Sequence, residues 1–395
     1  MAHHPRRGHG TSKFAKEGIV MKKLCVIFLV LSLIACGKKE TLAIETPFQD
    51  PFEYILSEQQ VASEENFFKL CAYGTYNEVA EAIRGGADPN LRTYEGLTPL
   101  MFATRSNPNP EVVSFLLRAG ANVNAMSEKG VTAIMCAAYG NRNHHVLSEL
   151  ILAGGDVNRV TPEGHFSALI LATGNNPNPE VISLLLRAGA KVDAPTTGGI
   201  SPLMSAAFGN INPQIIQTLI NAGSSVNARD KNGFTPLHHA AANNPNYKVL
   251  SILLQNGANI DSRTIDGGTP LMSAILFNPN DGVVMHILEE TPNVNARDNG
   301  GITPLLLAVG ANKSPQIVSK LIEMGANPNI EMQTVTPLMA AARFSNNPEI
   351  ISILLNSGAN ARPKNSTGKQ AIDYAKENPY LKDTPEYWRL HDASF

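Results

Sequence analysis

The sequence predicts an all-α repeat solenoid of about ten stacked units, and three observations support this prediction. From residue 98 onward the 395-residue chain repeats itself every 33 to 35 residues, and such a period indicates a stacked array. Each period holds two stretches with apolar residues at three- and four-residue spacing, which is typical of two short helices. In most periods a glycine follows the second stretch and supplies a helix stop.

A Thr-Pro-Leu tripeptide, or its serine form, marks the predicted start of the first helix in each unit. Threonine and serine are good N-caps, proline fits the first helical turn, and leucine begins the apolar stripe. Small residues such as Ala206 and Ala207 then allow helices to approach closely. The tripeptide lies at residues 98–100, 201–203, 235–237, 269–271, 303–305 and 336–338, with degenerate copies starting at 132, 167 and 370.

The second helix of each unit carries apolar runs such as residues 112–117, and a hairpin such as residues 226–233 follows it. These units resemble the ankyrin repeat, to which residues 235–241 (Thr-Pro-Leu-His-His-Ala-Ala) lie nearest, and the resemblance covers about residues 64–375. The family's usual period is 33 residues. The extra residue here lies between the two helices, as in residues 107–110 (Asn-Pro-Asn-Pro), where asparagine and proline favour a turn.

Divergent copies at residues 67–74 and 370–375 bring the count to ten units within a repeat domain of residues 64–395. The two outer copies are expected to act as caps, because uncapped solenoid ends are insoluble. Residues 36–63 are expected to be a tether with a possible helix over residues 50–63, which opens with a capping box. Five residues after the last repeat are expected to cover the terminal apolar face: Tyr380, Leu381, Tyr387, Trp388 and Leu390.

Residues 21–35 have the layout of a secretory signal, with Lys22 and Lys23 ahead of the apolar run 24–34. That run is shorter than the roughly 20 residues that span a bilayer. Residues 33–36 (Leu-Ile-Ala-Cys) resemble the lipobox of bacterial lipoproteins, which implies that Cys36 is acylated and becomes the new amino terminus. Residues 1–20 do not fit such a signal, so we expect translation to start at Met21 or residues 1–20 to be a misassigned start.

The lipoprotein resemblance also implies a location. In Gram-negative lipoproteins an aspartate after the cysteine favours retention in the inner membrane, and this chain has Gly37 there. We therefore expect a lipid-anchored protein of the bacterial outer membrane that faces the periplasm or the cell surface. Without the first 35 residues the chain carries a net charge of about −7, which offers no electrostatic footprint for nucleic acid.

Two cysteines, Cys71 and Cys136, remain in the predicted fold, two repeats apart. Helices that pack roughly 8 to 10 Å apart place them about 20 Å from each other, whereas a disulfide needs Cα atoms within about 7 Å. Both are expected to be buried free thiols.

The sequence contains no glycine-rich phosphate loop, no Gly-x-Ser-x-Gly elbow and no His-Glu-x-x-His motif. We therefore expect no enzyme, no cofactor and no metal. His238 stands at the family's structural histidine position, which implies a local hydrogen bond. Neighbouring histidines such as His238 and His239 point about 100° apart on a helix and cannot easily share one ion.

The family resemblance implies that an as yet unidentified protein partner binds the concave face, which consists of hairpin tips and the exposed side of the first helices. Its aromatics allow two interpretations: exposed rings suit a protein interface, or they pack against neighbouring hairpins or the lengthened loop. The predicted tip residues are Tyr94, Glu95, Lys129, Lys231, Asn232 and Phe234. The predicted first-helix residues are Arg105, Tyr139, Phe208, Phe277 and Phe344.

The expected function is therefore that of a monomeric, membrane-anchored protein–protein interaction module. An alternative is a surface-exposed or host-facing structural or adhesive protein. An enzyme with an unrecognised site is a weaker alternative, because no set of nucleophile, base and orienting residue stands outside the repeat positions.

Overall fold

The computed structural model describes residues 64–311 and 313–395. Ten helix pairs make up this part of the chain, which confirms the predicted all-α solenoid of ten units. Its only β-type pairings are isolated bridges, Val160 with Ser167 and Met332 with Val335. Residues 1–20, the predicted signal 21–35, the predicted lipid attachment site Cys36 and the predicted tether 36–63 lie outside the described residues. No described helix has the length and apolarity to cross a bilayer.

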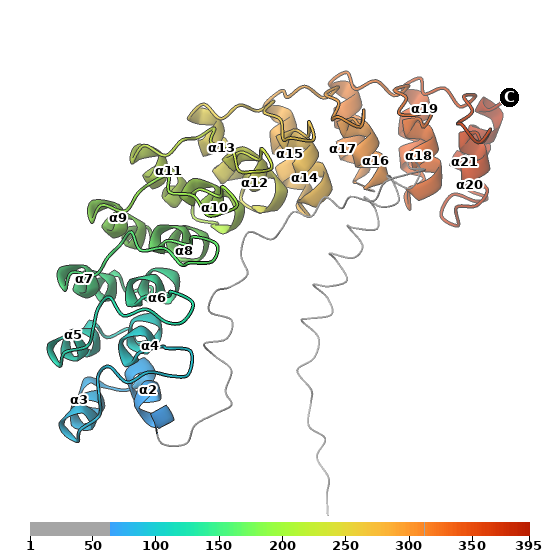
Figure 1. Ribbon diagram of the computed structural model, residues 1–395. Coiled ribbons are helices and arrows are strands. Elements are labelled where there is room, and N and C mark those ends of the chain that lie inside the picture. The colour runs from blue at the N-terminus through green and yellow to red at the C-terminus, as the bar shows by residue number, and fades with distance from the viewer. Residues whose placement is uncertain (1–63, 312) are drawn as a thin grey trace, which may run out of the picture. The chain divides into compact units, whose positions relative to one another are not determined.

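The first unit comprises residues 64–265, in which first helices pack on first helices and second helices on second helices (Figure 1). Its first helices are α2 (Glu64–Tyr73), α4 (Pro99–Ser106), α6 (Ala133–Gly140), α8 (Ala168–Asn175), α10 (Pro202–Gly209) and α12 (Pro236–Asn243). Its second helices are α3 (Tyr76–Arg84), α5 (Pro110–Arg118), α7 (His144–Leu152), α9 (Pro179–Arg187), α11 (Pro213–Asn221) and α13 (Tyr247–Gln255).

The second unit comprises residues 266–395 and is built in the same way. Its first helices are α14 (Pro270–Phe277), α16 (Pro304–Gly310), α18 (Pro337–Phe344) and α20 (Ala371–Ala375). Its second helices are α15 (Asp281–Glu289), α17 (Pro315–Glu323), α19 (Glu349–Asn356) and α21 (Pro385–Ala393).

The helix signals in the sequence work as predicted. Thr132 Oγ1 accepts the backbone N–H of Met135 at 3.3 Å, and the other first-helix threonines and serines cap in the same way. Gly120 and Gly223, just past their second helices, have φ angles of 93° and 95°. A Cβ at either would meet nothing within 4 Å. The left-handed backbone, rather than lack of space, therefore favours glycine there.

The core lies between the two rows of helices. In α5, for example, Val112, Val113 and Leu116 are fully buried. Cys71 and Cys136 are buried free thiols, as expected, and burial raises the pKa of each to about 12.

A buried asparagine ladder, which sequence analysis did not predict, links successive repeats of the first unit. Asn141 Nδ2 donates to Thr104 O at 3.0 Å and to Asn107 O at 2.8 Å, both in the preceding repeat. Its Oδ1 accepts the N–H of Asn143 at 2.9 Å in its own loop. One side chain thus supplies hydrogen-bond partners to three backbone groups at a helix end and in the loops, where helical hydrogen bonding does not provide them. The ladder consists of Asn107, Asn141, Asn176, Asn210 and Asn244.

A second row of asparagines caps the second helices. Asn143 Oδ1 accepts the N–H of His145 at 3.1 Å, and its Nδ2 donates to Pro108 O of the preceding loop at 2.7 Å. The interpretation of these loops as turns was therefore incomplete, because their asparagines also join one repeat to the next.

The expected cover over the last repeat is partly wrong. Leu381 and Leu390 are fully buried, whereas Tyr380 is 62% and Trp388 is 53% exposed. Trp388 and Leu390 are two residues apart on α21 and so point about 200° apart around its axis. Only one of the two can face the core, and the leucine does.

Candidate partner-binding surface

Each hairpin of the first unit is closed by a side chain at a corresponding repeat position. Thr196 Oγ1 accepts the N–H of Ile200 at 3.1 Å. In the next repeat Asp230 Oδ1 accepts the N–H groups of Phe234 and Asn232, each at 2.9 Å. These bonds hold the backbone of each turn in place. The side chains at the outer end of the turn are therefore not needed to stabilise it.

Backbone hydrogen bonds also join neighbouring hairpins. The N–H of Glu128 donates to Glu95 O at 2.9 Å, and the N–H of Lys231 donates to Gly198 O at 3.0 Å. The tips of the first unit therefore form an ordered row of exposed positions rather than independent loops.

The predicted tip residues differ in how much they offer to a partner. Tyr94 is 99% exposed. Lys129, Lys231 and Asn232 are also exposed, whereas Glu95 is half-buried. Phe234 is half-buried as well, because its ring lies 5.5 Å from that of His238 and 5.7 Å from that of His239.

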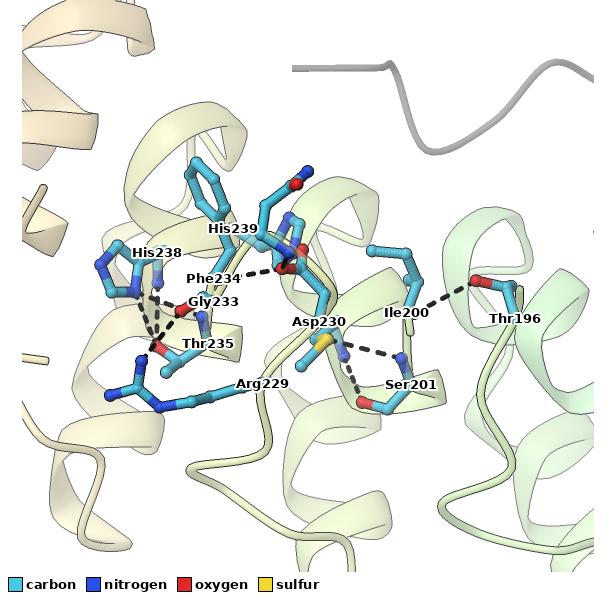
Figure 2. Close-up of polar contacts among 12 residues, drawn as sticks. Thr196, Ile200, Ser201, Arg229, Asp230, Gly233, Phe234, Thr235, His238 and His239 are labelled. Carbon is cyan, nitrogen blue, oxygen red and sulfur yellow. Dashed lines mark hydrogen bonds and ion pairs between the residues drawn. The ribbon is translucent and has the colours of Figure 1, made fainter. Parts of the chain in front are cut away.

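A buried polar pair lies behind the tip of hairpin 229–234. His239 Nε2 lies 3.0 Å from Asp230 Oδ2, with the two side chains 7% and 5% exposed. Figure 2 shows His239 on the first helix facing Asp230, with Phe234 beside both histidines. The ring of Phe208, from the preceding repeat, lies 6.2 Å from that of His239. The structure thus brings Phe208 and Phe234 together around one imidazole.

His238, the residue before His239 on α12, is fully buried. Its Nδ1 lies 2.9 Å from Thr235 Oγ1 and 3.2 Å from the backbone nitrogen of Thr235 (Figure 2). This confirms the expected local hydrogen bond. In the described part of the chain no three His, Cys, Asp or Glu side chains lie close enough together to hold a metal ion.

The predicted first-helix residues are all half-buried, so part of each side chain is packed and part is accessible. The guanidinium of Arg105 lies over the ring of Tyr139, 5.4 Å from its centroid. In the second unit, that of Arg343 lies 5.2 Å from the ring centroid of Phe344. Such stacking orders the rings and leaves part of each accessible. Phe277 is half-buried in the same unit.

Asp298 in the second unit occupies the hairpin position that Asp230 has in the first. Its Oδ1 accepts the N–H groups of Gly300 at 2.9 Å and Ile302 at 2.8 Å. Burial raises the pKa of Asp298, and these hydrogen bonds only partly oppose the shift.

Sequence reasoning missed the asparagine ladder and the pairing of Asp230 with His239. A signal for the ladder was present, since the same asparagine recurs in successive loops with the period of the repeat. No comparable signal marked the pair, because only one described hairpin places an aspartate against a histidine.

The match to a family model agrees with this architecture. No curated protein matches the chain in sequence. The crystal structure of the human ASB11 ankyrin repeat domain is similar, with a TM-score of 0.49 and 23% sequence identity over 59% of this chain and 99% of that chain. The sequence model described as ankyrin repeats (3 copies) matches residues 67–161, 134–230, 168–264, 203–298 and 305–382. Since these matches cover more than half of its length, the chain belongs to the ankyrin-repeat family.

Proposed function

We propose that this ankyrin-repeat chain is a monomeric, lipid-anchored module of the bacterial envelope that binds a protein partner through the hairpins and first helices of residues 64–265. Ankyrin repeats mediate binding to proteins, and the family is typically non-enzymatic. The observation that carries the choice of surface is the ordered row of tips, in which Tyr94 is 99% exposed while neighbouring hairpins hydrogen-bond to each other. A fixed, exposed aromatic is the kind of anchor that protein interfaces use.

Charge reversal tests this surface with a matched control. Lys231 at a tip and Lys248 on α13 are both exposed lysines of the first unit. We expect Lys231→Glu to weaken crosslinking of the partner to a photoreactive residue at position 94, and Lys248→Glu to leave it unchanged. Equal effects of the two variants would reject the tip row as the binding surface.

A second pair of variants separates binding from folding. Phe208→Ala, on the half-buried ring beside His239, is expected to reduce crosslinking while the unfolding midpoint changes little. Leu203→Ala, at a fully buried position of the same helix, should cost about 2 to 5 kcal/mol. If Phe208→Ala costs as much stability as Leu203→Ala, the ring is structural and does not belong to the interface.

The anchor rests on the lipobox-like residues 33–36, which lie outside the described residues. Cys36→Ala is expected to release the protein from sedimented membranes and to abolish palmitate labelling. Retention of the variant in the membrane fraction would contradict the anchor and leave the binding surface unaffected. Protease treatment of intact cells then separates the two proposed locations, because only a surface-exposed array is cleaved.

A further inference from the structure

Arg343, on the first helix α18 of the second unit, holds an exposed guanidinium against two aromatic rings. Its Cζ lies 5.2 Å from the ring centroid of Phe344 and 5.3 Å from that of Tyr374. Tyr374 belongs to α20, the first helix of the next repeat, which packs against α18 (Figure 1). Rings from two adjacent repeats thus position one cation, while the Arg343 side chain remains exposed.

The ring of Tyr374 is itself held in place. It is 6% exposed, and its hydroxyl accepts a hydrogen bond from Asn365 Nδ2 at 2.6 Å. Asn365 Oδ1 accepts the N–H groups of Thr367 and Lys369, each at 3.0 Å, so the same side chain also closes the hairpin before α20. A guanidinium that stacks on a fixed ring has lost side-chain freedom before a ligand arrives, which lowers the entropy cost of binding.

The hydrogen-bond donors of Arg343 are not used inside the fold. Within residues 64–311 and 313–395 its guanidinium makes no hydrogen bond, and no carboxylate oxygen lies within 4.0 Å of it. Another exposed arginine of this unit behaves differently, because Arg389 donates to Ser352 Oγ at 2.9 Å and to Asn356 Oδ1 at 2.7 Å. The N–H groups of Arg343 are therefore available to a ligand.

The charges around Tyr374 leave one cation without a counter-ion. Lys369 Nζ lies 5.3 Å from the centroid of the Tyr374 ring, but it pairs with Glu377 Oε1 at 3.0 Å. Asp373 is likewise paired with a lysine, at 3.6 Å. These ion pairs leave the charge of Arg343 unmatched. One excess positive charge suits a carboxylate, which carries one negative charge, better than a phosphate monoester, which carries about −1.5 to −2.

We propose that Arg343 is a docking point for an acidic segment of the partner protein. Its guanidinium binds an aspartate or glutamate carboxylate through two parallel N–H···O bonds, and Phe344 and Tyr374 position the guanidinium plane. The inference rests on the proposed protein-binding function and adds the chemistry of one segment of the partner. It does not use the surface of residues 64–265, so the two proposals can fail separately.

A fluorescently labelled peptide of eight glutamates tests the docking point on the full chain, with anisotropy as the measurement. We expect the parent to bind this peptide and not to bind a peptide of eight glutamines. Arg343→Gln should weaken binding about fivefold or more. Arg343→Lys should weaken it about threefold, because it keeps the charge but loses the planar fork. The urea unfolding midpoint should stay unchanged in both variants, since the side chain is exposed.

Arg142→Gln is the matched control, because Arg142 is an exposed arginine of the first unit without a described ring contact. This variant should bind the peptide as the parent does. Failure of the parent to bind the glutamate peptide would overturn the proposal. Equal binding by the parent and Arg343→Gln, or an equal loss in Arg142→Gln, would also overturn it, because the peptide would then respond to general charge.

Two further measurements locate the contact and identify its chemistry. Carbodiimide coupling forms an amide between an ammonium and a carboxylate that are in contact, so the bound peptide should crosslink to Lys369 in the parent and not in Arg343→Gln. Inorganic phosphate at constant ionic strength should not displace the peptide. Displacement by phosphate would show that the site prefers phosphate, and the assignment to an acidic protein segment would be wrong.

Discussion

Nε2 of His239 lies 3.0 Å from Oδ2 of Asp230, and both side chains are almost completely buried. The other carboxylate oxygen of Asp230 holds two N–H groups of the hairpin tip. The pair therefore ties helix α12 to the hairpin that precedes it, and it does so directly behind Lys231 and Asn232. A partner that binds these tips meets a loop already fixed in place, which lowers the entropy cost of association.

Asp230→Ala should destabilise the chain by about 1 to 3 kcal/mol, because it leaves the imidazole and two amides without their acceptor. Asp230→Asn should cost less, since the amide oxygen can still accept from the tip and a neutral imidazole can change tautomer. Urea unfolding of both variants measures the difference. Should alanine and asparagine prove equivalent, the acceptor role assigned to Asp230 is wrong.

The asparagine ladder allows a sharper comparison between two neighbouring residues. Asn176 donates to Ala138 O and Asn141 O and accepts the N–H of Asn178, and it is 1% exposed. Asn175 is exposed and donates only to Leu171 O in its own helix. We expect Asn176→Ala to cost about 2 to 4 kcal/mol and Asn175→Ala less than about 0.5 kcal/mol. Similar unfolding midpoints would show that the ladder contributes little.

These two asparagines also show where sequence reasoning ends. Period, N-caps and C-cap glycines are local features, so the ten helix pairs followed from the residues alone. The role of Asn176 depends on carbonyls 35 and 38 residues earlier, whose closeness exists only once the repeats stack. The half-burial of Phe208 depends in the same way on His239 in the next repeat. The position of each tip residue in the repeat predicted that these residues share one surface. It could not predict how exposed each side chain is.

Thr291 occupies the left-handed position after a second helix where most other repeats have glycine. Its φ is 54°, it is β-branched, and Pro292 follows it, which restricts its backbone further. Thr291→Gly should therefore stabilise the second unit by about 1 kcal/mol. The reciprocal change Gly325→Thr, at φ 88°, should destabilise it by a similar amount. If the first change lowers the urea midpoint, Thr291 makes a stabilising contact that outweighs its backbone strain.

The raised pKa of Asp298 makes a prediction about pH. Burial disfavours the ionised carboxylate in the folded chain, so the native state binds its proton more tightly than the unfolded state does. The resulting penalty is absent below the unfolded pKa of about 3.9. It appears as pH rises and is complete above the higher pKa of the folded state.

Asp298→Asn removes that charge and keeps an oxygen that can accept from the N–H groups of Gly300 and Ile302. The variant should therefore gain stability over the parent between about pH 3 and neutral pH, with most of the gain above the folded pKa of Asp298. Paired urea titrations across this range measure the difference in unfolding free energy, which subtracts the titration of every other group. A difference that stays constant with pH would mean that the two amide hydrogen bonds balance the cost of burying the carboxylate. A difference that favours the parent increasingly as pH rises would mean that they outweigh it.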